Sequence, residues 1–189
     1  MNTPGHLLLG AVAFARPAML DVTLAALSGA AFPDLSVVFL VLWSQYVSGH
    51  SQQYIFDTLY FSDSWQAVFA IDNSIPLWTG LFALAVRRQW RLIVAFAGAG
   101  LLHLFLDLLL HHDDGRVHFW PFTDWKFESP VSYWDSAHYG SIAAAALLAL
   151  SAAATIALFQ RFKGVGYRAI FTALLVAEAY FASVWIRFF

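Results

Sequence analysis

Residues 92–110 read LIVAFAGAGLLHLFLDLLL, and this stretch decides the fold class of the chain. Its only ionisable side chains are His103 and Asp107. A transmembrane helix needs about 20 mostly apolar residues, so the stretch is long enough to cross a bilayer. A charged side chain at membrane depth costs on the order of 3 kcal/mol, so a span that keeps a histidine and an aspartate indicates a use for both.

These two side chains share a helix face with a third. His103, Asp107 and His111 are spaced i, i+4, i+8, which places them on one side of a helix. A His-x3-Asp pair is common by chance, but its position in an otherwise uncharged span gives it weight. Two interpretations stand: a metal or acid–base site, or a buried His–Asp hydrogen bond that joins two helices.

The composition places the whole chain in a membrane. Its 189 residues are 60% hydrophobic and 12% charged, with a mean hydropathy of +0.65, whereas soluble domains carry about 25% charged residues. The length suits a single membrane-embedded domain, residues 1–189. The net charge of −2 gives no basic surface for nucleic acid. There are no cysteines, so a metal would be held by histidine, carboxylate or asparagine.

The apolar segments predict an all-α polytopic bundle of about five transmembrane helices after a short N-terminal helix. The short helix covers residues 4–15, and the expected spans are 18–47, 65–86, 92–110, 141–159 and 169–186, the last two forming a C-terminal hairpin within 138–189. Proline lacks a backbone donor and disfavours a helical residue before it. Pro33 therefore predicts either a kinked first span or two half-helices that meet at Asp34.

Basic residues predict the orientation. Arginine and lysine concentrate in three short loops, near residues 16, 87–91 and 161–168, which we expect to face the cytoplasm of a bacterial inner membrane. The acidic loop 112–137 then faces outward. His103 and Asp107 lie about 18 Å and 24 Å of helix rise from Arg91, which places a site there in the outer half of the membrane.

Polar residues beside the helix breaks predict one cavity with a divalent metal. The expected ligands are His6, Asp34, His103, Asp107, His111 and His112, and the expected catalytic carboxylates are Asp72 and Asp107. Asp34 and Asp72 have an alternative role as helix caps. Imidazole and carboxylate without sulfur suit zinc, our first choice, or manganese. Such a metal activates water for hydrolysis, and Asp113 or Asp114 would orient a ligating imidazole.

Several motifs resemble a known family. His6-x3-Gly10, Pro33-Asp34, His103-x3-Asp107 and Trp120-Pro121-Phe122 are similar to motifs of the YdjM-like membrane-bound metal-dependent hydrolases, a domain of unknown function, over residues 4–134. That family is distantly similar to zinc-dependent phospholipase C and P1 nuclease, in which a His-x3-Asp pair bridges metals. The resemblance implies this role for His103 and Asp107. It also implies hydrolysis of a phosphoester or similar bond in a lipid-embedded substrate.

Two departures from the family pattern leave a second function open. Ser36 stands where the family usually has a second aspartate, and Asn73 stands where it has a histidine. The alternative to a hydrolase is a non-catalytic integral membrane protein that binds an ion, lipid or cofactor in a polar intramembrane cavity. A purely structural cluster would hold no metal and would tolerate His103→Gln. The expected partners are membrane lipids and a lipid-like substrate.

Overall fold

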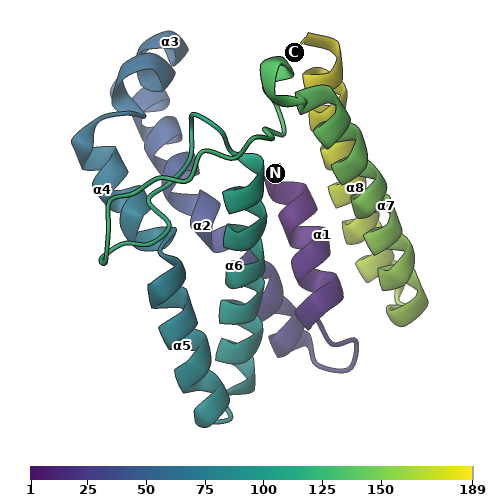
Figure 1. Cartoon of the computed structure of the whole chain (residues 1–189). Coiled ribbons are helices and arrows are strands. Elements are labelled where there is room, and N and C mark those ends of the chain that lie inside the picture. The colour runs from purple at the N-terminus through teal and green to yellow at the C-terminus, as the bar shows by residue number, and fades with distance from the viewer. Residues whose placement is uncertain (189) are drawn as a thin grey trace.

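The computed structural model describes residues 1–188 and is all-α (Figure 1). Five helical segments are long and apolar enough to cross a membrane, which confirms the predicted fold class of a multi-pass protein. They are α2 (Leu20–Tyr46), α4 (Asp63–Asp72) with α5 (Ile75–Arg87), α6 (Arg91–Leu110), α7 (Gly140–Arg161) and α8 (Val165–Phe188). The short N-terminal helix α1 spans Thr3–Phe14, and the short elements are α3 (Gln52–Tyr54), η1 (Ile55–Leu59) and η2 (Ser136–His138).

Helix α1 lies at the centre of the bundle, where it packs against α2, α6, α7 and α8. Small side chains make this packing close, since alanine and glycine let transmembrane helices approach each other. The main buried cluster joins Leu8 and Ala11 of α1 to Ala30 of α2, Ala99 of α6 and Leu158 of α7. Helix α1 is too short to cross a membrane alone and is enclosed by longer helices. Its side chains therefore lie in the interior of the bundle.

Helix α2 runs without a break through Pro33. The alternative of two half-helices is therefore wrong, and Asp34 is not a helix cap. Proline removes only one backbone donor, and neighbouring helices in a membrane protein can compensate for that loss. The predicted interruption near Asp72 is present, because α4 ends there and Ser74 caps α5 by accepting a hydrogen bond from the amide of Leu77.

The connecting segments separate by charge to opposite ends of the bundle. Figure 1 shows the α1–α2, α5–α6 and α7–α8 connections at one end, and the long segment between α6 and α7 at the other. Arg161 links two of the basic connections by donating hydrogen bonds to the carbonyls of Val12 and Ala15, each at 2.5 Å. This arrangement is compatible with basic loops inside, although the orientation itself stays a prediction.

Candidate metal centre

The carboxylate of Asp107 is the centre of a buried polar cluster. Its Oδ1 lies 2.9 Å from His6 Nε2, and its Oδ2 lies 3.0 Å from His103 Nε2. The α-amino group of Met1 also donates to Oδ1, at 3.0 Å. One ligand atom from each of His6, His103 and Asp107 lies within 4.8 Å of the others, and all three residues are buried, so this group could hold a metal ion.

The hydrogen bonds of His103 fix its tautomer. Its Nδ1 lies 2.7 Å from the carbonyl oxygen of Ala30, and because a carbonyl only accepts, Nδ1 carries a proton. Its Nε2 faces Asp107 Oδ2 at 3.0 Å and Asp34 Oδ1 at 3.6 Å. A neutral imidazole would direct a lone pair at these two carboxylates, so Nε2 needs a second proton or a cation beside it. Histidine ligands of metals usually have this arrangement, with the other ring nitrogen donating to a carbonyl.

His6 reaches the cluster because α8 fixes the start of α1. The first amides of a helix have no partner within the helix. Glu178 of α8 accepts a hydrogen bond from the amide of Gly5 at 3.2 Å and another from the side chain of Asn2 at 3.1 Å. With α1 held in this way, the ring of His6 stacks on His103, and its Nδ1 is buried with no partner among the described residues.

Two further predicted ligands border the cluster. Asp34 accepts a hydrogen bond of 2.5 Å from the hydroxyl of Thr3. The Nε2 atom of His111 lies 3.5 Å from Asp107 Oδ1, and its Nδ1 lies 2.9 Å from Asp114 Oδ2, one of the two aspartates expected to orient a ligating imidazole. Burial by itself lowers the pKa of His111, but the charges of Asp107 and Asp114 outweigh it, so the pKa is raised.

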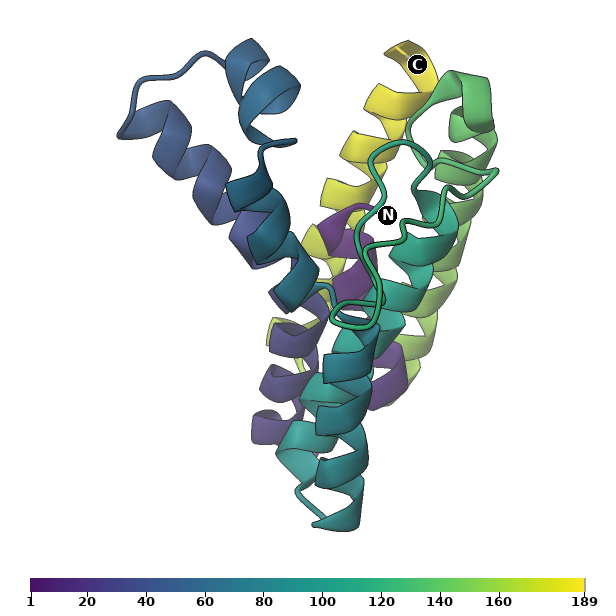
Figure 2. The ribbon, with the colours of Figure 1, turned by 60° about the vertical axis from the view of Figure 1, so that its left-hand side comes forward.

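A cavity of about 760 Å³ adjoins the cluster. This volume lies within the range of small-ligand sites. The cavity's polar lining includes Asp34, Asp107, His111, Asn73 and Arg116. Its apolar lining comes from α2, the short helical segment after it, and α8, through Val37, Val38, Phe56, Phe61, Phe181 and Trp185. Figure 2 shows the later half of α2 diverging from α8, which separates these two apolar sides.

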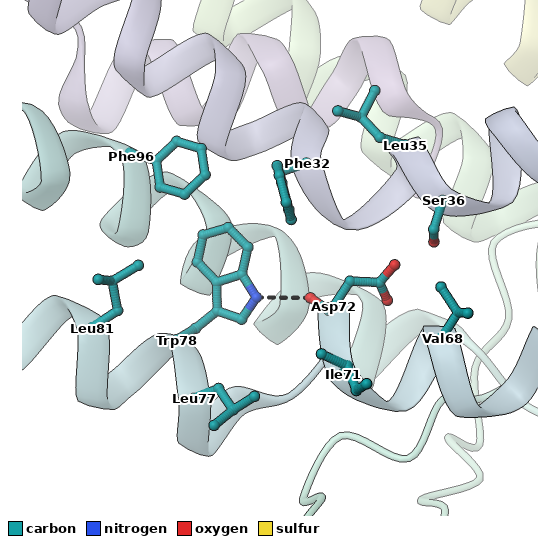
Figure 3. Close-up of a pocket in the computed structure, with 10 residues that line it drawn as sticks. All are labelled: Phe32, Leu35, Ser36, Val68, Ile71, Asp72, Leu77, Trp78, Leu81 and Phe96. Carbon is teal, nitrogen blue, oxygen red and sulfur yellow. Dashed lines mark hydrogen bonds between the residues drawn. The ribbon is translucent and has the colours of Figure 1, made fainter.

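The structure does not bring Asp72 to this cluster. Asp72 lines a different, mostly apolar pocket of about 460 Å³, together with Ser36 and Trp78 (Figure 3). Its backbone carbonyl accepts a hydrogen bond of 2.7 Å from the indole of Trp78, and its carboxylate accepts one of 2.5 Å from Asn73. Asp72 is the last residue of α4, and the next residue, Asn73, borders the larger cavity instead.

His112 also lies in a separate set of contacts. Its Nδ1 donates to the carbonyl of Ser129 at 2.8 Å, and its ring stacks on His138 with a centroid distance of 3.6 Å. Helix α6 ends at Leu110, so His111 and His112 do not continue its periodicity as a pair. Only His111 of the two contacts Asp107.

Sequence reasoning missed three groups near the cluster: Met1, Thr3 and Arg116. Thr3 lies three residues before His6, a spacing that places both on one side of a helix and could have identified it. Arg116 is one of only two basic lysine or arginine residues in the acidic loop. Its place beside the cavity depends on the path of that loop, which carries no periodic signal.

The chain is thus a five-span helical membrane protein with a buried His-His-Asp cluster that could hold a metal. No family model matches it, and no curated protein and no solved structure matches it either.

Proposed function

We propose that the protein is a membrane-bound metal-dependent hydrolase whose metal is held by His6, His103 and Asp107. The placement of the proton on His103 carries this proposal. The carbonyl of Ala30 holds that proton on Nδ1, so Nε2 faces Asp107 and Asp34 as a donor atom for a cation. Two imidazoles and one carboxylate match the three-ligand sets of catalytic zinc sites, which keep another position open. Zinc is the preferred ion and manganese the second choice.

The residues around this group supply positioned proton carriers. When bound, a divalent ion supplies Lewis acidity and makes water more acidic, which favours hydrolysis. Asp34, which accepts a hydrogen bond from Thr3 and lines the cavity, would accept a proton from water. His111, whose Nδ1 lies 2.9 Å from Asp114, would give a proton to a leaving group. In this proposal Asp34 replaces Asp72, which the sequence suggested as a catalytic carboxylate.

The substrate we propose carries a phosphoester or similar bond and sits in the lipid. Two features support this choice: the cavity combines a polar floor with apolar sides, and the motifs resemble those of the YdjM-like hydrolases. The basic loops favour an orientation that puts the site in the outer half of the membrane, which we take to be a bacterial inner membrane. Membrane lipids would be the surroundings and a lipid-like molecule the substrate.

Metal content tests the proposal directly. Detergent-purified wild-type protein, His103→Ala and Asp107→Ala would be compared by elemental mass spectrometry, with His112→Ala as the matched control. We expect one or two zinc or manganese ions per chain in the wild type and in the control, and loss in the other two variants. The wild type should then release phosphate or a phosphorylated headgroup from phospholipids or isoprenoid phosphates. No bound metal after reconstitution with zinc or manganese would refute the assignment.

Asn73 favours the second candidate function, a membrane protein that binds an ion, lipid or cofactor without catalysis. It borders the cavity and is buried, at the position where the resembling family has a histidine. Stoichiometric metal with no hydrolysis of any phospholipid or isoprenoid phosphate would support this alternative. The Asn73→His variant would then be the informative comparison, since it restores the imidazole at the same wall of the cavity.

A further inference from the structure

The cavity contains an arginine with no carboxylate partner. Arg116 lines the cavity, and its Nη1 is buried with no hydrogen-bond partner in the described part of the chain. Within residues 1–188, its guanidinium makes no ion pair with an aspartate or glutamate. A buried donor without an acceptor is unfavourable, so Nη1 is available to a ligand that carries one.

Aromatic rings hold the guanidinium in place. Its Cζ lies 4.1 Å from the ring centroid of Phe69 and 4.8 Å from that of Tyr60, both within cation–π range. The backbone carbonyl of Arg116 accepts hydrogen bonds from the amide and the Nδ1 of His118, both at 3.0 Å. The guanidinium is therefore held against the aromatic rings while its Nη1 keeps a hydrogen-bond donor for an anion.

Four carboxylates line the same cavity as Arg116. They belong to Asp34, Asp107, Asp113 and Asp114. These carboxylates would repel an anion, whereas Arg116 would attract it. Met1 also lines the cavity, but its α-amino group is already paired with Asp107 at 3.0 Å. The apolar sides, which include Val38 and Phe181, would accept a hydrocarbon chain but offer nothing to a charged group.

We infer that Arg116 binds the phosphate of an amphiphilic substrate whose hydrocarbon chain lies against the apolar walls of this cavity. This inference rests on the proposed function, because it names the substrate class of the same site. Guanidinium groups pair with phosphate oxygens through two parallel hydrogen bonds, a geometry that favours arginine over lysine. Arg116 is thus a specificity-determining residue that favours amphiphiles with an anionic phosphate over neutral ones.

Binding of dodecylphosphonate, which a phosphoesterase cannot hydrolyse, tests the inference. The probe would be titrated into zinc-loaded protein in a maltoside detergent and followed by tryptophan fluorescence, because Trp134 and Trp185 line the cavity. We expect Arg116→Gln to weaken binding by roughly tenfold to a hundredfold, the range of one charged hydrogen-bonding contact. Arg116→Lys should weaken it less. Arg88→Gln, at an exposed arginine after α5, is the matched control and should bind as the wild type does.

Three comparisons separate the outcomes. Equal binding of dodecylphosphonate by wild type, Arg116→Gln and Arg116→Lys, with unchanged zinc content, would overturn the inference while leaving the proposed metal site intact. If the wild type bound no metal but still bound the probe, and Arg116→Gln weakened that binding, the result would support the inference about Arg116. It would refute the proposed metal-dependent hydrolase. If inorganic phosphate displaced the probe at concentrations as low as those at which dodecylphosphonate itself binds, the hydrocarbon chain would contribute nothing to binding. That result would overturn the inference that the substrate is an amphiphile. Unchanged melting temperatures confirm that the variants are folded.

Discussion

The imidazole rings of His6 and His103 stack face to face, with their centroids 3.6 Å apart and their planes 12° from parallel. The Nε2 atoms of both rings contact the same carboxylate, that of Asp107. Two imidazolium rings at this separation would repel each other strongly in a medium of low dielectric constant. The two rings therefore cannot both be protonated without a large cost. Either at least one ring is neutral, or one cation binds the Nε2 atoms of both, which is the arrangement of a metal site.

Replacing His103 by glutamine separates a metal site from a structural cluster. A glutamine amide can still hydrogen-bond to Asp107, so a purely structural cluster would lose little. A metal ligand is lost, however, and we expect zinc binding to become undetectable while the melting temperature falls by only a few degrees. Zinc binding would be measured by elemental mass spectrometry beside thermal unfolding. His112→Gln is the matched control, and equal metal content in both variants would contradict the assignment.

Thr3→Val tests whether Asp34 acts from a fixed position. Valine has nearly the shape of threonine but lacks the hydroxyl that donates to Asp34. Removing an orienting hydrogen bond beside a metal site typically costs tenfold or more in activity. We expect the rate of phospholipid or isoprenoid phosphate hydrolysis to fall roughly tenfold with metal content preserved. Thr58→Val, at an exposed position, controls for the substitution itself. An unchanged rate would show that Thr3 does not position Asp34 for the reaction.

Glu178→Ala tests the contact that anchors α1. Glu178 is fully buried and accepts hydrogen bonds from Gly5 and Asn2. Its removal leaves these donors unsatisfied, which costs about 1–3 kcal/mol each in a buried setting. We expect a lower melting temperature and weaker zinc binding, because His6 lies on the same helix. Glu128→Ala, in the exposed loop, should change neither quantity.

The membrane architecture was predictable because hydropathy acts along the chain. The spans of 18 or more apolar residues need no knowledge of distant contacts, and all five are present. The importance of His103 and Asp107 was predictable for the same reason. A charged side chain in a membrane span costs free energy whichever helices pack around it. The continuity of α2 through Pro33 was harder to predict, because a proline can either interrupt a helix or lie within it, and the sequence around Pro33 does not decide between the two.

The membership of the polar cluster was only partly predictable. His6 joins Asp107 because α8 supplies Glu178 to the start of α1, a contact across most of the chain. Asp72 lies beside a helix end, where a rotation of one residue decides which pocket it borders, and Asn73 takes the place expected for it. The sequence pattern shows which polar residues lie in membrane spans. The positions of the helix ends and the path of the loops determine which of these residues contact each other.

Gly29→Ala tests the close approach of α2 and α6. A Cβ atom at Gly29 would overlap the backbone of Phe96, which cannot move aside as a flexible side chain could. We expect a strong loss of thermal stability, since overpacking at helix backbones costs about 1–3 kcal/mol or more. Gly80→Ala is the matched control: a Cβ there meets nothing within 4 Å, and alanine favours a helix by about 1 kcal/mol. Equal melting temperatures for the two variants would contradict this close contact between α2 and α6.

His118 makes the stability of the protein sensitive to acid. Burial lowers the pKa of His118 from its ordinary value of 6.5 to about 4, and within the described residues its Nε2 has no partner. The unfolded chain therefore binds the proton more readily between pH 6.5 and 4, and stability present above pH 6.5 is lost as the pH falls through this window. The loss reaches about 3 kcal/mol at most, from 1.36 kcal/mol per pKa unit.

The measurement is the difference in pH dependence between wild type and His118→Asn. Asparagine keeps a donor for the carbonyl of Arg116, which His118 Nδ1 contacts at 3.0 Å, but it does not titrate. Both proteins share every other ionisable group, so those contributions cancel in the comparison. We expect the melting temperature of the wild type to fall more steeply than that of the variant between pH 6.5 and 4. Parallel curves would mean that His118 is protonated as easily in the folded protein as in the unfolded chain, which would require water or an acceptor at its Nε2.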